Sequence, residues 1–178
     1  MRVIAGSAKG RRLSSPRGLA TRPMTSRARE ALFSSLGDAI VGARVLDLFA
    51  GSGALGIEAL SRGAAAATFV ERGRPALRSL HANLAATGFT GEVIAADVTA
   101  VISRLGGPFD LVFLDPPFTM GPDAVAALLD DLVPVTAQAA SVVLHRRAGE
   151  PPVPTPPQLA AHGDRRYGDS VLWRYTRN

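Results

Sequence analysis

The stretch Asp115-Pro116-Pro117-Phe118 combines residue types that can hold a planar amine and stack on it. It follows an apolar run, residues 109–114, that is typical of a buried strand bounded by Gly-Pro and Pro-Pro. Ligands of open α/β sheets bind at the carboxyl ends of the strands. Two successive prolines remove two backbone donors, so the local carbonyl groups stay free to accept hydrogen bonds. These residues therefore predict a site for a nucleobase that carries an exocyclic amine.

A second constellation lies upstream in residues 45–56, where a predicted strand leads into a glycine-rich turn and a helix. The turn matches the dinucleotide pattern G-x-G-x-x-G, and Glu71 lies 20 residues beyond Gly51. By spacing alone this pattern leaves an NAD site open. Asp47 argues against NAD, because a carboxylate before the turn repels a pyrophosphate but suits the ammonium and sulfonium groups of S-adenosylmethionine.

Acidic residues end three successive predicted strands, which places them at one edge of the sheet. We expect Asp47 to face the amino group of the cofactor, Glu71 to accept from the ribose hydroxyls and Asp97 to accept from the adenine amine. The predicted cofactor-binding residues are Asp47, Phe49, Gly51, Gly53, Glu71, Arg72, Asp97 and Val98. The predicted catalytic residues are Asp115, Pro116 and Phe118.

Composition narrows the chemistry further. The chain has no Cys, which excludes disulfides, thiolate zinc sites and thiol nucleophiles. Methylation of pyrimidine C5 normally uses a Cys, so a base-modifying enzyme of this sequence should act on a nitrogen. The three His residues have no metal-ligand spacing, and we expect no metal site. No apolar run reaches about 18 residues and the N-terminus lacks signal-peptide features, so we expect no membrane span and a cytoplasmic location.

Positive charge is concentrated at the start of the chain. Residues 1–37 contain eight basic residues and one acidic residue, whereas the other 141 residues contain 12 basic and 14 acidic residues. This distribution favours an arm that binds phosphates over a merely solvated tail. The residues predicted to bind nucleic acid through this arm are Lys9, Arg11, Arg12, Arg22 and Arg27.

The pattern of elements predicts an α/β fold with a mostly parallel, seven-stranded sheet that ends in an antiparallel hairpin. We expect strands at Arg44–Phe49, Ala67–Glu71, Glu92–Ala96, Leu111–Leu114, Ser141–Leu144, Ala160–Tyr167 and Ser170–Thr176. We expect helices at Leu55–Ser61, Pro75–Ala86, Val98–Leu105 and Asp123–Leu132. Residues 1–37 should form a small basic extension, a hairpin over 3–13 and a helix from Thr25 or Ser26 to Gly37, docked on a catalytic domain of residues 38–178.

Over nearly its whole length the sequence resembles the bacterial small-subunit ribosomal RNA guanine-N2 methyltransferases of the RsmD type. The resemblance rests on residues 1–6 and 9–13, on Arg22-Pro23 and residues 27–33, on the glycine-rich turn after Asp47, on Val70-Glu71 and on Asp115-Pro116-Pro117-Phe118. It departs at Met24-Thr25-Ser26, where the family usually has Thr-Thr-Asp, and in the proline-rich stretch 149–157.

The resemblance implies a Rossmann-like class I methyltransferase fold, S-adenosylmethionine as donor and N2 of one guanine in 16S ribosomal RNA as target. It also implies that a small-subunit assembly intermediate is the preferred substrate, and we expect the protein to be a monomer. The residues alone leave other activities open: an adenine-N6 or glutamine-N5 methyltransferase, or an RNA-binding module without catalysis.

Overall fold

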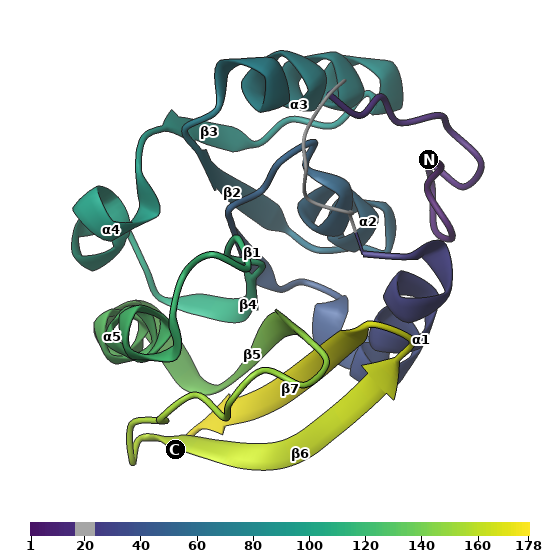
Figure 1. Ribbon diagram of the computed structural model, residues 1–178. Helices are drawn as coiled ribbons and strands as arrows, with labels where there is room; N and C mark the ends of the chain where they lie inside the picture. The colour runs from purple at the N-terminus through teal and green to yellow at the C-terminus, as the bar shows by residue number, and fades with distance from the viewer. Residues whose placement is uncertain (17–23) are drawn as a thin grey trace.

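The computed structural model describes residues 1–16 and 24–178. Its centre is one seven-stranded sheet in the order β3-β2-β1-β4-β5-β7-β6 (Figure 1). The first five strands in that order are parallel, and β7 runs antiparallel to both of its neighbours. The strands are β1 Arg44–Leu48, β2 Ala66–Glu71, β3 Glu92–Ala95, β4 Phe109–Leu114, β5 Thr136–Arg147, β6 Leu159–Tyr167 and β7 Ser170–Arg177. The predicted sheet and its terminal hairpin are confirmed.

Helices cover both faces of the sheet and bury one apolar cluster on each side (Figure 1). One face packs against α1, α2 and α3, and the other packs against α4 and α5. The α-helices are α1 Ser26–Leu36, α2 Ala54–Ser61, α3 Arg74–Thr87, α4 Val98–Val101 and α5 Pro122–Leu132. Three short 3₁₀ turns follow helices: η1 Gly37–Ile40, η2 Ile102–Arg104 and η3 Val133–Val135.

Sequence periodicity explains which face of each strand meets which helices. Successive strand residues point to opposite sides, so Val45 belongs to the cluster under α1 and α2, whereas Leu46 belongs to the cluster under α4 and α5. Leu32 and Phe33 of α1 join the first cluster, and the Phe33 ring lies 5.5 Å from that of Phe113. Helix α1 is therefore packed into the core of the sheet domain.

The first 14 residues dock on α2 and α3 through buried polar side chains. The carboxylate of Glu58, which is fully buried, accepts from the backbone N–H groups of Ile4 and Ala5 at 2.8 and 3.0 Å. The Ser61 hydroxyl donates to the Ala5 carbonyl at 2.6 Å and accepts from the Ala8 N–H at 3.0 Å. The segment folds back on itself as the predicted hairpin requires, but within the described residues it forms a single antiparallel β-bridge, between Arg2 and Arg12.

Two elements differ from the sequence expectations. The helix predicted over Val98–Leu105 is divided into one turn of α-helix and a 3₁₀ turn. Strand β5 is much longer than predicted, because it continues through an irregular register at Ala139, a non-glycine residue with φ of 61°. Such bulges lengthen a strand while interrupting the alternation that reveals it in a sequence.

No helix among the described residues is long and apolar enough to cross a bilayer.

Candidate active site

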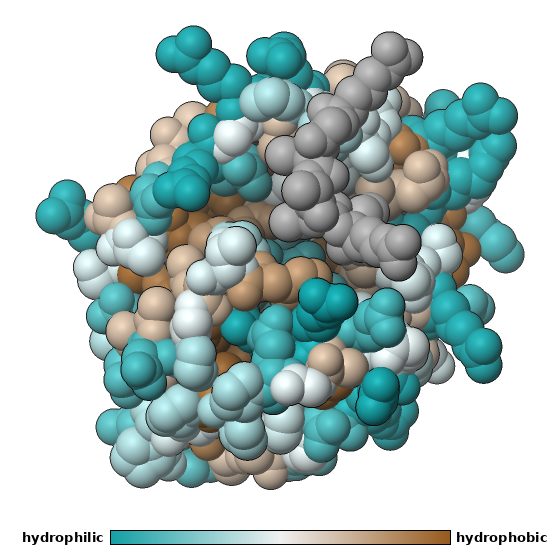
Figure 2. All heavy atoms as spheres, in the orientation of Figure 1, coloured by the Kyte–Doolittle hydropathy of each residue, from teal (hydrophilic) through white to brown (hydrophobic). Residues whose placement is uncertain are grey.

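A cavity of about 460 Å³ opens at the carboxyl ends of β1, β2, β3 and β4. Figure 2 shows apolar surface in the hollow around the ends of β1 and β2, with hydrophilic side chains around it. Nearly all residues predicted for cofactor and target line this cavity: Asp47, Phe49, Gly51, Glu71, Arg72, Asp97, Val98, Asp115, Pro116 and Phe118. The cavity is in the size range of small-molecule sites. The structure thus brings the glycine-rich turn and Asp115 to one place.

Asp47 is buried at the inner wall of the cavity, with an exposed fraction of 1%. Its Oδ2 accepts from the Gly56 N–H at 2.9 Å. Burial raises the pKa of Asp47 to about 8; the Gly56 N–H opposes this rise, and the nearby carboxylates of Asp115 and Glu71 add to it. A cation placed beside Asp47 would favour its ionised form, because opposite charges stabilise each other.

Two glycines of the motif, one before α2 and one within it, occupy positions at which a Cβ would clash. Gly53 has φ of +76°, and a Cβ there would lie 2.2 Å from Cδ1 of Leu80 in α3. A Cβ on Gly56 would lie 2.3 Å from the Phe69 ring. Gly53 is not among the residues that line the cavity, and its predicted contact with the cofactor stays a prediction. Its backbone conformation lets α2 begin close to α3 and the sheet.

Glu71, at the end of β2, braces the turn. One carboxylate oxygen accepts from the Gly51 N–H at 2.9 Å and the other from the Gly73 N–H at 2.6 Å. Each oxygen retains acceptor capacity, because a carboxylate offers about four lone-pair sites. Glu71 can therefore hold the turn and still accept from a ligand in the cavity.

Asp97 forms the cap of α4 at the rim of the cavity. Its carboxylate accepts from the hydroxyl and N–H of Thr99 at 2.8 and 3.0 Å and pairs with Arg72 at 2.6 Å. The Thr99 hydroxyl, the Thr99 N–H and the Arg72 guanidinium hold the pKa of Asp97 below its ordinary value. Asp97 thus remains an ionised acceptor, although Thr99 and Arg72 occupy part of its capacity.

Asp115 lies beside a residue that the sequence reasoning missed. Its Oδ1 is 2.7 Å from Nδ1 of His145, which is 2% exposed. A carboxylate only accepts, so Nδ1 of His145 is the donor. The Phe118 ring meets the imidazole edge-on, with ring centroids 5.7 Å apart. The buried Nε2 of His145 has no partner among the described residues, so the contact with Asp115 is the one side-chain hydrogen bond of this imidazole in the described structure.

Four of the five predicted RNA-binding residues belong to the described chain, and none of these four lines the cavity. Lys9, Arg11, Arg12 and Arg27 are exposed on the N-terminal segment and α1. Arg22 lies outside the described residues. Arg29, which is buried, has a different role: its guanidinium donates to the Arg2 carbonyl, and burial lowers its pKa.

The sheet order, the glycine-rich turn after β1 and the acidic residues at the strand ends define the Rossmann-like methyltransferase fold. Within that class, the chain belongs to the family described as "Conserved hypothetical protein 95", whose model matches residues 1–176.

Similar proteins carry related names. Escherichia coli K12 "Ribosomal RNA small subunit methyltransferase D" is 44% identical over 122 residues, which cover 68% of this chain and 62% of that protein. Bacillus subtilis "Putative rRNA methyltransferase YlbH" is 40% identical over 159 residues, which cover 85% of this chain and 86% of that protein. The solved structure "Putative methyltransferase yhhF from Escherichia coli" is 37% identical, with a TM-score of 0.88 over 100% of this chain and 98% of that one.

Proposed function

We propose that this protein transfers a methyl group from S-adenosylmethionine to the exocyclic N2 of a guanine in 16S ribosomal RNA. One observation carries the proposal: Asp115, at the end of β4, shares a cavity with Asp47 and the glycine-rich turn at the end of β1. The two strands are direct parallel neighbours, with Leu48 paired to Leu114. A methyl donor held at one strand end is thereby adjacent to an amine held at the other.

The residues of the cavity fit the proposed cofactor. Asp47 is a buried carboxyl group that forms no ion pair within the described part of the chain, which suits the ammonium of the methionine part. Glu71 has acceptor capacity left for ribose hydroxyls, and Asp97 and Val98, which line the same cavity, are proposed to contact the adenine. When bound, S-adenosylmethionine supplies an electrophilic methyl group on a sulfonium.

The residues 115–118 supply the other half of the site. Asp115 accepts one N–H of the target amine, and its orientation is set by the hydrogen bond from His145. The Pro116 carbonyl is the second proposed acceptor, and the Phe118 ring is the stacking surface for the base. Holding the amine in line with the methyl group reduces the barrier, because orientation alone contributes on the order of 7–11 kcal/mol in intramolecular reactions. Asp115 or water then takes the proton released from the methylated nitrogen.

The substrate is proposed to be RNA within a small-subunit assembly intermediate, bound by the monomer in the cytoplasm. The base must leave its helix to enter the cavity, which is the usual requirement for chemistry on a nucleobase. The exposed Lys9, Arg11, Arg12 and Arg27 are proposed to contact phosphates, as is Arg22. By this proposal residues 1–37 are the RNA-binding extension and residues 38–178 the catalytic domain.

The test is to map methylated nucleotides in small-subunit RNA and particles incubated with the purified protein and S-adenosylmethionine. We expect a single N2-methylguanine, and we expect Asp115→Ala to lose most turnover while still binding S-adenosylhomocysteine. Methyl transfer to adenine or to protein, or wild-type turnover by the Asp115→Ala variant, would contradict the proposal.

A further inference from the structure

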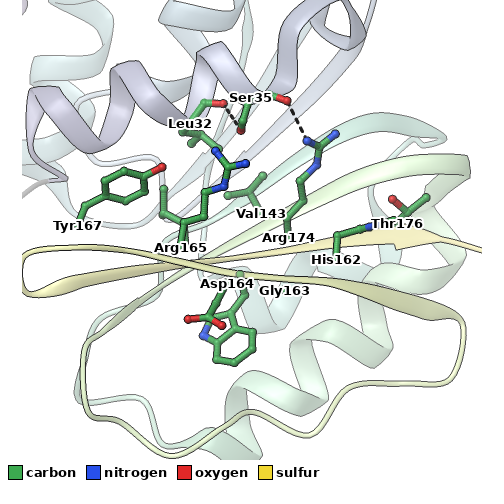
Figure 3. Close-up of a pocket in the computed structure, with 12 residues that line it drawn as sticks. Leu32, Ser35, Val143, His162, Gly163, Asp164, Arg165, Tyr167, Arg174 and Thr176 are labelled. Atoms are coloured by element: carbon green, nitrogen blue, oxygen red, sulfur yellow. Dashed lines mark hydrogen bonds between the residues drawn. The ribbon is translucent and has the colours of Figure 1, made fainter.

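A second hollow, with a volume of about 360 Å³, lies between α1 and the β6–β7 hairpin. We call it the hairpin groove. Arg165 of β6 and Arg174 of β7 extend into it toward α1, beside Tyr167 (Figure 3). Asp164 points to the opposite side of the hairpin (Figure 3), as strand alternation requires of a neighbour of Arg165. Apolar side chains complete the wall: Leu32, Val143 and Leu172.

The two arginines of the hairpin groove are held differently. Nη1 of Arg174 donates to the Ser35 carbonyl near the end of α1 at 2.9 Å, so this side chain ties the hairpin to the helix. Nε of Arg174 is buried without a partner in the part of the chain described. Arg165 is exposed, and its guanidinium makes no hydrogen bond or ion pair with the described residues. The groove thus carries two positive charges, and neither arginine forms an ion pair with a carboxylate of the described chain, although Asp164 is among the residues that line the groove.

Sheet register joins the hairpin groove to the active site. Leu114 pairs with Leu144, which puts Asp115 beside His145; His145 pairs with Leu172, and Leu172 pairs with Arg165. Residues in one such row share a face of the sheet. Arg165 is therefore on the same face as Asp115 and three strand spacings away, about 14 Å.

We propose that the hairpin groove binds a backbone phosphate of the RNA substrate, a few nucleotides from the one whose base enters the active site. This rests on the proposed function and adds a contact outside the N-terminal extension. A base drawn in beside Asp115 leaves its flanking nucleotides on the protein surface, within reach of Arg165. The planar guanidinium matches a phosphate in two parallel hydrogen bonds. The groove's Tyr167 and apolar wall are suited to the sugar and base that accompany the phosphate.

The test compares Arg165→Ala with Arg166→Ala, a matched control on the next residue of the same strand. Arg166 points to the other face, and its Nε donates to the Gly168 carbonyl at 3.1 Å. RNA affinity is measured against salt concentration with small-subunit RNA, and S-adenosylhomocysteine affinity is measured alongside. Arg165→Ala should lower the salt slope by about 1 and raise KM for RNA with kcat unchanged, since one phosphate contact is lost. Arg166→Ala should leave both values at wild type.

An unchanged slope in Arg165→Ala, with wild-type protein that binds and methylates RNA, would overturn the groove proposal and leave the proposed function intact. An equal loss in both variants would also overturn it, because it would show diffuse attraction to the hairpin. A wild-type protein that binds S-adenosylhomocysteine but neither binds nor methylates RNA would instead refute the proposed function, and the groove proposal with it.

Discussion

The buried Asp47 predicts that cofactor binding releases a proton. Its pKa is raised from 3.8 to about 8 by burial, so most molecules carry a protonated Asp47 at pH 7 in the absence of ligand. A bound ammonium group beside the carboxyl favours ionisation. About one Asp47 in 100 is ionised at pH 6 and about one in 11 at pH 7 for a pKa near 8. Affinity should therefore rise roughly nine-fold over this interval, with about 0.9 proton released per cofactor at pH 7.

Calorimetry provides the measurement. Titrating S-adenosylhomocysteine into the protein at pH 6.0, 6.5 and 7.0, in buffers of different ionisation enthalpy, reports affinity and proton release together. The α-amino group of the ligand stays mostly charged over this range, since such groups titrate at about 7.7–8.0. Asp47→Asn is the matched variant, because its amide oxygen can still accept from the Gly56 N–H. It should bind more weakly and with no proton release.

The free energy of unfolding supplies an independent check, because it should fall with pH whereas the cofactor affinity should rise. Without ligand, the unfolded chain ionises Asp47 near pH 4, while the folded chain keeps the proton until about pH 8. This contribution to stability is full below about pH 4 and is lost as pH rises to 8, at about 1.4 kcal/mol per pH unit at most. Asp47→Asn should flatten the decline. Wild-type affinity that is flat from pH 6 to 7, together with equal pH dependence of unfolding in both proteins, would refute the reasoning.

Three other changes test separate parts of the structure. His145→Leu should lower kcat by about 10- to 150-fold, because a hydrogen bond to a charged group contributes about 1.5–3 kcal/mol. His145→Asn, which can still donate to Asp115, should retain most activity. Equal losses in the two variants would contradict a positioning role for His145. Glu58→Gln should lower the free energy of unfolding by about 1–3 kcal/mol in urea titrations, because the buried N–H donors lose an acceptor; an unchanged midpoint would count against the docking. Replacing Arg11 and Arg12 together by Ala should lower the slope of log RNA affinity against log salt concentration by about 2, whereas Arg104→Ala should leave this slope unchanged. A wild-type slope in the double variant would show that the N-terminal segment does not contact RNA phosphates.

The parallel sheet and most of the cavity could be predicted because local sequence encodes them. Apolar runs bounded by Gly and Pro mark the strands, and acids placed directly after such runs fall at one edge of the sheet. That is enough to bring Asp47, Glu71, Asp97 and Asp115 to one cavity. Gly53 shows what the motif does not predict. The motif predicts the turn, but only the structure shows that a Cβ on Gly53 would point at Leu80 of α3.

His145 could not be found in the same way, because it belongs to no motif. The predicted fifth strand ends at Leu144, and the contact with Asp115 depends on the register between β4 and β5. The available signal was that both residues follow directly after neighbouring parallel strands. Glu58 likewise looks like an ordinary helix residue, since its backbone partners lie more than 50 positions away.

Asn83 of α3 is hydrogen-bonded both to the N-terminal segment and to the glycine-rich turn. Its side-chain amide is 1% exposed and donates to the Ser52 carbonyl, within the cofactor turn, and to the Ser14 carbonyl, each at 2.9 Å; its oxygen accepts from the Ser14 N–H at 2.7 Å. A single side chain thereby connects the basic N-terminal segment to the loop on which the methyl donor is proposed to bind. If bound RNA shifts that segment, Asn83 would transmit the shift to the donor loop, and RNA and cofactor should then alter each other's affinity by the same factor.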